Sequence, residues 1–311
     1  MEKKNISMYK TKHIKQPVSR KVFVAFNVIF LFLLAFLFVA PYLNIMAKAF
    51  NTASDTARGG LAFWPRDFTW DNISLVFSDS GIIQGLIVSV WRVIIGTLIS
   101  LVVTYMAGYA LLQKGLWGRG IWVMFLSIPM FISGGLIANY IIFAKIGIFN
   151  NFWVYVLPTA FSFFNMTMVR TYLTTIPDSL SEAARIDGAN EFVIMWKIML
   201  PLSMPIVATL ALWSIVGHWN NWTDTLYYIR RPQLYTLQYQ LQLTLKESEQ
   251  IQMMIAEAIA SGRPLGDINM DITGESIQAA LIIVSTIPMV IMYPFLQKYF
   301  LKGMMIGGVK E

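Results

Sequence analysis

Apolar residues form long blocks along this chain, and shorter polar segments separate the blocks. A helix needs about 20 mostly apolar residues to cross the hydrocarbon core of a bilayer. Blocks of this kind predict membrane-spanning helices at residues 22–47, 85–112, 118–143, 152–176, 202–223 and 277–297. The pattern therefore predicts an all-α transmembrane protein with six spans.

The composition agrees with a membrane protein. Hydrophobic residues make up 56% of the chain and charged residues only 13%, well away from the composition of soluble domains. The chain has no cysteine, so it forms no disulfide bond and gives no sign of its redox compartment. Its formal charge of +7 could fit a nucleic-acid partner, but the charges lie where they would orient the chain in a membrane.

The basic residues gather at the two ends of the chain. Residues 1–21 carry Lys3, Lys4, Lys10, Lys12, Lys15, Arg20 and Lys21 against the single acid Glu2, and the tail 298–311 carries Lys298, Lys302 and Lys310. Acids balance or outnumber bases in segments 48–84 and 224–276. By the positive-inside rule, residues 1–21 and 298–311 are cytoplasmic and both segments are external loops. The run 22–46 is too long for a signal peptide, which predicts an uncleaved first span.

The two predicted external loops have different characters. Segment 48–84 is rich in aromatic residues that suit either a membrane interface or a partner surface: Phe63, Trp64, Phe68 and Trp70. Segment 224–276 is longer than most loops, and its apolar pattern favours a folded structure. We expect an extended stretch at 234–243, a helix near 246–259 and a turn at 261–264.

Residues 85–297 form the predicted core, which contains the last five spans. A charged segment lies within this core, in the predicted cytoplasmic loop 177–201. It contains Glu182, Ala183, Ala184, Arg185, Asp187, Gly188 and Ala189. Gly188 is expected to end a helix, because glycine tolerates the left-handed conformation of a C-cap. A second amphipathic stretch follows and is expected to end at Pro201. Two interpretations stay open: a passive connection between spans, or a handle for a partner outside the membrane.

The sequence predicts no catalytic site and no metal site. His13 and His218 lie far apart, and no Gly-x4-Gly-Lys-Ser/Thr phosphate loop occurs. We therefore expect a conduit that is not itself an enzyme and binds no cofactor.

A polar and aromatic cluster near the end of the fifth span is a candidate for substrate contact. It consists of Trp219, Asn220, Asn221 and Trp222. Aromatic faces and amides could bind a sugar, but the same residues could form an interfacial tryptophan belt capped by asparagine. A second candidate patch in the fourth span consists of Phe163, Phe164, Asn165 and Arg170. Arg92 in the second span needs an acid, an anionic substrate or backbone carbonyls as its partner.

Several of these motifs together resemble a known family. Glu182-Ala183-Ala184, Asp187-Gly188-Ala189 and Leu200-Pro201 are similar to the EAA loop of bacterial ABC importer permease subunits. The segment 219–222 and the tail around 297–310 resemble the carbohydrate-uptake branch, in its MalG-like second subunit. The resemblance covers roughly residues 75–311.

The resemblance implies a six-helix type I ABC importer permease in a bacterial cell membrane. Residues 182–189 would form a cytoplasmic coupling helix that docks on a separate ATPase, which would bind ATP and Mg. The implied partners are a second, homologous permease in a heterodimer, two ATPase subunits, an extracytoplasmic solute-binding protein and a sugar, with an oligosaccharide expected, but no nucleic acid. The loop 224–276 would contact the binding protein or form a solvated cap.

Two other functions stay open at this point. One is an ion-coupled secondary transporter, although the predicted spans are almost free of acids and show no repeat. The other is an ABC permease for a solute that is not a sugar.

Overall fold

The computed structural model describes residues 17–261 and 274–307. His13, most of the basic N-terminal residues, most of the predicted turn at 261–264 and the end of the tail lie outside these residues. The described part is helical, with no strand and one isolated bridge between Asn51 and Phe68. Its α-helices are α1 (Val18–Ala49), α2 (Ala53–Ala57), α3 (Asp71–Ser78), α4 (Ser80–Ala110), α5 (Arg119–Phe131), α6 (Gly135–Lys145), α7 (Phe163–Leu173), α8 (Asp178–Ile186), α9 (Glu191–Val193), α10 (Leu200–Leu202), α11 (Met204–Asn220), α12 (Thr223–Tyr228), α13 (Leu237–Ala260) and α14 (Gly274–Gly307). Short 3-10 turns are η1 (Phe152–Tyr155), η2 (Leu157–Thr159) and η4 (Pro232–Leu234), and η3 (Ile194–Met199) is a π-helix. The all-α prediction is confirmed.

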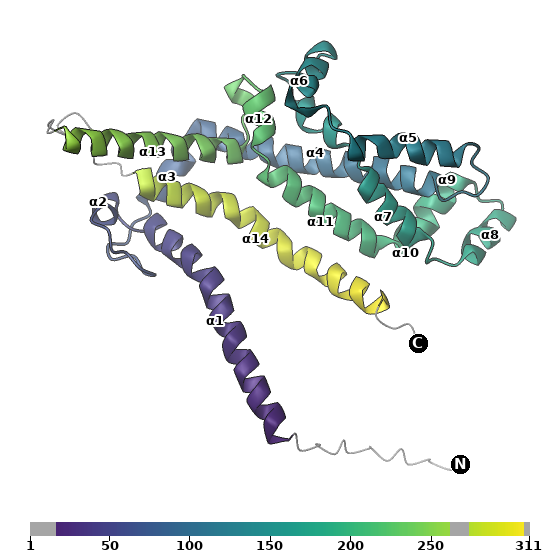
Figure 1. Ribbon diagram of the computed structural model, residues 1–311, viewed down its shortest axis with the longest axis horizontal. Helices are drawn as coiled ribbons and strands as arrows, with labels where there is room; N and C mark the ends of the chain where they lie inside the picture. Colours follow the sequence, from purple (N-terminus) through teal and green to yellow (C-terminus); the bar gives the residue numbers. More distant parts are fainter. Residues whose placement is uncertain (1–16, 262–273, 308–311) are drawn as a thin grey trace.

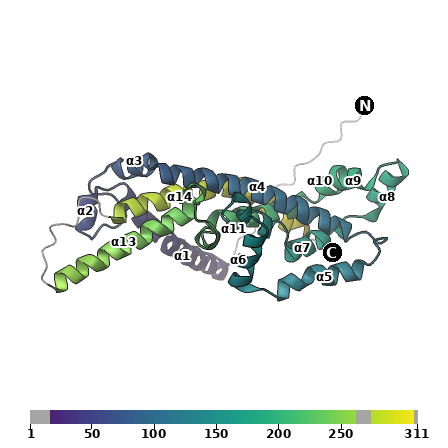
Figure 2. The same ribbon diagram turned by 90° about the horizontal axis from the view of Figure 1, so that it is seen from above.

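Helix α4 is the axis of the molecule. It runs along α7 and α11 at one end and along α13 at the other, while α14 packs against α11, α13 and α1 (Figures 1 and 2). Helix α8 projects from the end opposite to α2 and α3 (Figure 1). One apolar cluster lies near α3 and includes Val76 and Leu281, and another lies near α8 and includes Leu173 and Ile194.

Three helices are long and apolar enough to cross a membrane unaided: α1, α4 and Glu275–Pro294 of α14. Three further spans would each be a bent pair of helices: α5 with α6 at 116°, residues 152–159 with α7 at 48°, and residues 191–202 with α11 at 82°. By length and composition the described residues thus contain up to six spans.

Close helix contact in the middle of the molecule depends on Gly96 of α4. A Cβ atom at this position would lie 2.5 Å from the imidazole of His218 on α11. A side chain at this position would force the His218 imidazole to move, so the α4–α11 contact as observed favours glycine here. Small residues serve this purpose in many packed membrane helices.

The prediction of an extended stretch at 234–243 is wrong. Residues from Leu237 onward belong to α13, and Leu237 and Leu241 are both buried. The alternation of leucine and glutamine resembles a strand pattern, but positions i and i+4 are also one face of a helix. Packing of that face against α4 and α14 decides between the two.

The prediction that Pro201 ends its helix is also wrong. The chain stays helical through Leu202 and breaks at Ser203. Pro205 lies in the first turn of α11, where a missing N–H is tolerated, and Pro201 lies two residues before the break. The Ser203 hydroxyl donates to the Met199 carbonyl at 2.7 Å and satisfies the backbone at the break.

Candidate functional site

The helix α8 ends as the sequence predicts. Gly188 has a φ of +82°. Its N–H donates to the Arg185 carbonyl at 3.1 Å, and the Ala189 N–H donates to the Ala184 carbonyl at 2.9 Å. These two bonds are those of a Schellman motif, in which a left-handed residue satisfies the last carbonyls of a helix.

The predicted coupling residues divide between two sides of this segment. Ala184 is buried in the apolar cluster near α8, and Ala189 packs against that cluster. Exposed positions are Glu182, Ala183, Asp187 and Gly188, together with Ile186, which is 86% exposed. In the isolated chain, the apolar side chain of Ile186 is therefore in contact mainly with solvent.

The side chain of Arg185 contacts other residues of the helical bundle and does not point away from it. Its Nε donates to Glu191 at 2.7 Å, and its Nη2 donates to the side-chain oxygen of Gln113 at 3.2 Å. The hydroxyl of Tyr109, at the end of α4, donates to the other oxygen of Glu191 at 2.6 Å. This polar tether links α8 to the end of α4.

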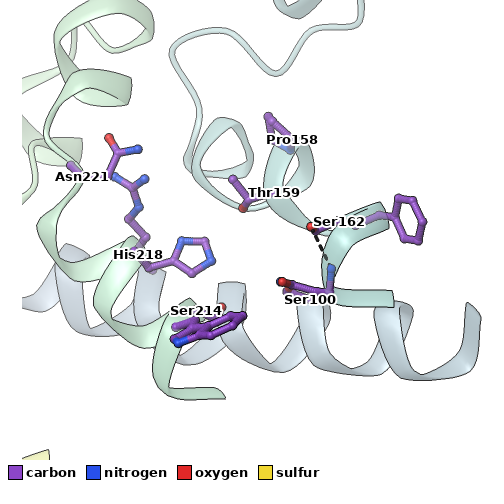
Figure 3. Close-up of a pocket in the computed structure, with 12 residues that line it drawn as sticks. Ser100, Pro158, Thr159, Ser162, Ser214, His218 and Asn221 are labelled. Carbon is purple, nitrogen blue, oxygen red and sulfur yellow. Dashed lines mark hydrogen bonds between the residues drawn. The ribbon is translucent and has the colours of Figure 1, made fainter. Parts of the chain in front are cut away.

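A second feature is a pocket of about 410 Å³ between α4, α7 and α11. Its walls carry mostly hydroxyl, amide and aromatic groups: Arg92, Ser100, Pro158, Thr159, Phe161, Ser162, Asn165, Trp213, Ser214, Gly217, His218 and Asn221. Figure 3 shows His218 and Asn221 on one side of this space and Thr159 and Ser162 on the other. Small-ligand sites are concave and combine aromatic surface with directed polar groups, and this pocket has both, with a larger polar share than most.

Arg92 lies at the edge of this pocket and is 1% exposed. It forms an ion pair with Asp224, and its Nη1 donates to the Asn221 carbonyl at 2.9 Å. The guanidinium also lies 4.5 Å from the ring centroid of Tyr155, a favourable cation–π position. The pair joins the middle of α4 to the start of α12.

Only part of the predicted substrate-contact set reaches the pocket. Asn165 and Asn221 line it, whereas Asn220 is exposed elsewhere and Phe163 and Trp222 do not line it. Trp219 is buried in the cluster near α3 and donates its indole N–H to the Ser285 carbonyl at 3.0 Å. The side-chain oxygen of Asn221 accepts the backbone N–H of Asp224 at the start of α12.

Sequence reasoning missed Trp213, Ser214 and the hydroxyls of Ser100 and Ser162. One signal was available. Arg92, Gly96 and Ser100 follow each other at intervals of four along an otherwise apolar span, which places them on one helix face. No group of three or more His, Cys, Asp or Glu residues that could hold a metal occurs among the described residues.

Comparison with known proteins identifies the family. The profile described as "Binding-protein-dependent transport system inner membrane component" matches residues 114–306. The chain belongs to this family. It is therefore the membrane-embedded permease of an ABC importer, which works with a binding protein and ATPase partners, and permeases of this family are not themselves enzymes.

Relatives of the permease include two proteins of Bacillus subtilis strain 168. It is 32% identical to the "Polygalacturonan/rhamnogalacturonan transport system permease protein YtcP", over 90% of this chain and 96% of the relative. It is also 32% identical to "Protein LplC", over 93% of this chain and 95% of the relative.

A solved structure shares the fold. It is the "Crystal structure of a bacterial ABC transporter involved in the import of the acidic polysaccharide alginate", with a TM-score of 0.81 and 24% identity. The match covers 92% of the permease and 99% of the chain in that structure. The six-helix permease fold predicted from the sequence is thus confirmed.

Proposed function

We propose that the permease forms one half of the membrane path by which an oligosaccharide enters a bacterial cell. The other half would be a second, homologous permease. Two ATPase subunits, which bind ATP and Mg, would drive the transport, and an extracytoplasmic protein would deliver the sugar.

The observation that carries this proposal is the pocket between α4, α7 and α11. It lies within the helices that qualify as membrane spans, and its hydroxyl and amide groups match the hydrogen bonds that sugar hydroxyls need. Trp213 supplies an aromatic face for the C–H surface of a sugar ring. The names of several relatives, among them permeases for arabinooligosaccharides, galactooligosaccharides and maltodextrin, support the same substrate class.

The coupling helix in this proposal is α8. The exposed face with Glu182, Ala183 and Ile186 would contact the ATPase, while Ala184 and Arg185 hold the helix on its own bundle. One side of α8 would thus contact the ATPase, and the other side would pass the movement of the ATPase to the helix bundle.

The orientation follows from the same assignment. Helix α8 would lie on the cytoplasmic side with both chain termini, and α2, α3 and α13 would lie on the external side. The basic residues near the N-terminus support this orientation.

The test is transport by the complete complex in proteoliposomes that contain ATP. Labelled arabino-, galacto- and malto-oligosaccharides and galacturonides would be offered with the binding protein. We expect at least one class to be taken up and to stimulate ATP hydrolysis.

Two controls separate this function from its alternatives. Uptake should survive a protonophore and stop when the ATPase subunits are removed; the reverse result would establish a secondary transporter. Stimulation by a solute of another class, with none by any sugar, would show an ABC permease for a different cargo.

A further inference from the structure

The loop between α2 and α3 carries two exposed aromatic side chains at its tip. We name residues 58–66 the aromatic loop. Within it Trp64 is 83% exposed and Phe63 is 40% exposed, although Leu61 beside them is buried. The loop has no regular secondary structure, yet its conformation is held by many contacts.

Side chains satisfy three carbonyl groups of this loop. The amide nitrogen of Asn44, in α1, donates to the carbonyls of Leu61 and Ala62 at 2.7 and 2.8 Å. Arg66 Nη2 donates to the Gly59 carbonyl at 2.8 Å. Irregular backbone is tolerated near hydrocarbon only where such partners replace water.

A second observation places the tip at the depth of the membrane span. The ring of Phe63 contacts the ring of Phe36, with 5.8 Å between the centroids. Phe36 lies in the apolar part of α1, whose span begins after Lys21. With a rise of 1.5 Å per residue, a 20-residue span starting there extends roughly 7 Å beyond Phe36.

Figure 1 shows the chain between α2 and α3 beside the C-terminal end of α1. The loop therefore lies against a helix whose apolar side chains are exposed, and Phe63 contacts that helix. Tryptophan is also the residue that membrane interfaces favour most, together with tyrosine.

We propose that the aromatic loop is a membrane anchor, with Phe63 and Trp64 inserted among the lipids of the leaflet at the C-terminal end of α1. Asn44 acts as a positioning residue that holds the loop backbone at this depth. The anchor would fix α2 and α3, and through them the adjoining end of α14, relative to the bilayer.

The absence of native cysteine makes a direct test simple. A nitroxide label on Trp64→Cys would be studied in the complete complex, in vesicles of phosphatidylethanolamine and phosphatidylglycerol. Its exposure to oxygen, which concentrates in lipid, would be compared with its exposure to a water-soluble nickel chelate. The unsubstituted complex treated with the same reagent gives the background from partner subunits.

Two reference positions define the scale. Phe32→Cys places the label on the exposed apolar face of α1, and Arg58→Cys places it at the exposed start of the loop. We expect the oxygen-to-nickel ratio at Trp64→Cys to lie near that of Phe32→Cys. A ratio like that of Arg58→Cys would place the tip in water, and protection from both reagents would mean that a protein partner covers it. Either result would overturn the proposal.

The role of Asn44 has its own test. Asn44→Leu removes both bonds to the loop, and the label at Trp64→Cys should then become more exposed to the nickel chelate. Asn27→Leu is the matched control, because Asn27 is exposed in the same helix. An unchanged ratio in Asn44→Leu would show that Asn44 does not position the anchor.

Discussion

Arg92 is a fully buried cation, and its burial restricts how α4 and α12 can pack. A guanidinium that is 1% exposed within a membrane span requires a counter-charge and hydrogen-bond acceptors, and it finds them in Asp224 and the Asn221 carbonyl. Tyr155 adds a ring above the cation and in turn donates to the Leu234 carbonyl at 2.7 Å. One residue of α4 thereby holds the turn at α12.

Substitution of Asp224 should destabilise the fold strongly. Asp224→Asn leaves a buried cation without its counter-charge, and breaking such a pair costs about 3–5 kcal/mol. The measurement is the temperature at which the purified permease loses its folded form in detergent.

Asp178→Asn is the control for this prediction. Asp178 forms an ion pair with Lys114, but both side chains are largely exposed, at 73% and 86%. Exposed pairs contribute about 0–1 kcal/mol. Equal losses in the two variants would contradict a special role for the Arg92 pair.

Asp55 is the acid through which we expect low pH to act on the aromatic loop. A hydrogen bond from the Asn51 amide, with another from the Arg66 guanidinium, lowers the pKa of this carboxyl below its ordinary value of 3.8. A lowered folded-state pKa means stabilisation above the unfolded-state value, which is lost as the pH falls through the folded-state value. We therefore expect the loop to loosen below about pH 4.

The same label at Trp64→Cys would report this loosening as a rise in nitroxide mobility. The variant Asp55→Asn should be looser at neutral pH and lose most of the acid-dependent change. Asp71→Asn, an exposed acid in α3, should keep it. If Asp55→Asn kept the full acid response, another group would be responsible.

At the residue scale, the sequence predicts which side chains need partners but not which partners they have. Arg92 is recognisable as a lone cation in an apolar span. Asp224 lies 132 positions later, after a turn whose geometry depends on packing of α11, α12 and η1. The polar and aromatic surroundings of Trp219 in the sequence favour a substrate contact. The face of α11 that carries Trp219, however, is turned toward the apolar cluster near α3, where its indole is buried.

At the element scale, α8 is the segment that the sequence describes best. Glycine after a charged helix predicts a left-handed C-cap, and Gly188 adopts it. The side on which each residue lies could not be predicted, because it depends on contact with the apolar cluster near α8 and on the bond from Arg185 to Glu191. Similarly, the amphipathic stretch after Gly188 gave no sign of the π-helix Ile194–Met199.

Substitution of Gly188 should uncouple transport. Gly188→Asp forces a side chain into a left-handed conformation, which aspartate tolerates better than most residues; the strain is therefore at the lower end of roughly 1–2 kcal/mol, and the added charge lies at the exposed end of α8. We expect the variant to reach the membrane but to bind the ATPase subunits weakly and to transport little. Co-purification and uptake measure the two effects.

Gly115→Asp introduces the same charge in the neighbouring loop without backbone strain. Gly115 has open space around its Cβ position, as Gly188 does, but its φ is not positive. We expect this control to keep ATPase binding. Normal binding and uptake in Gly188→Asp would contradict the docking assignment for α8.

At the scale of the whole molecule, α4 connects the two candidate sites. Arg92 and Ser100 line the pocket, while Tyr109 at the end of the same helix bonds to Glu191 beside α8. The six apolar blocks could be predicted because each span needs its own apolar surface. The bends of 48° to 116° in three of them could not, because they depend on how neighbouring helices pack.

Substitution of Trp213 should show whether the pocket lies on the transport path. Trp213→Ala removes an aromatic wall, and an aromatic contact contributes about 0.5–1.5 kcal/mol, so the KM for the transported sugar should rise roughly two- to tenfold. Basal ATP hydrolysis should stay unchanged, because α8 and its tether are untouched. Phe164→Ala is the matched control: it removes the ring that stacks on Trp213 at 6.2 Å but does not line the pocket. If both variants raised KM equally, the effect would come from helix packing, and the sugar would follow another route through the permease pair.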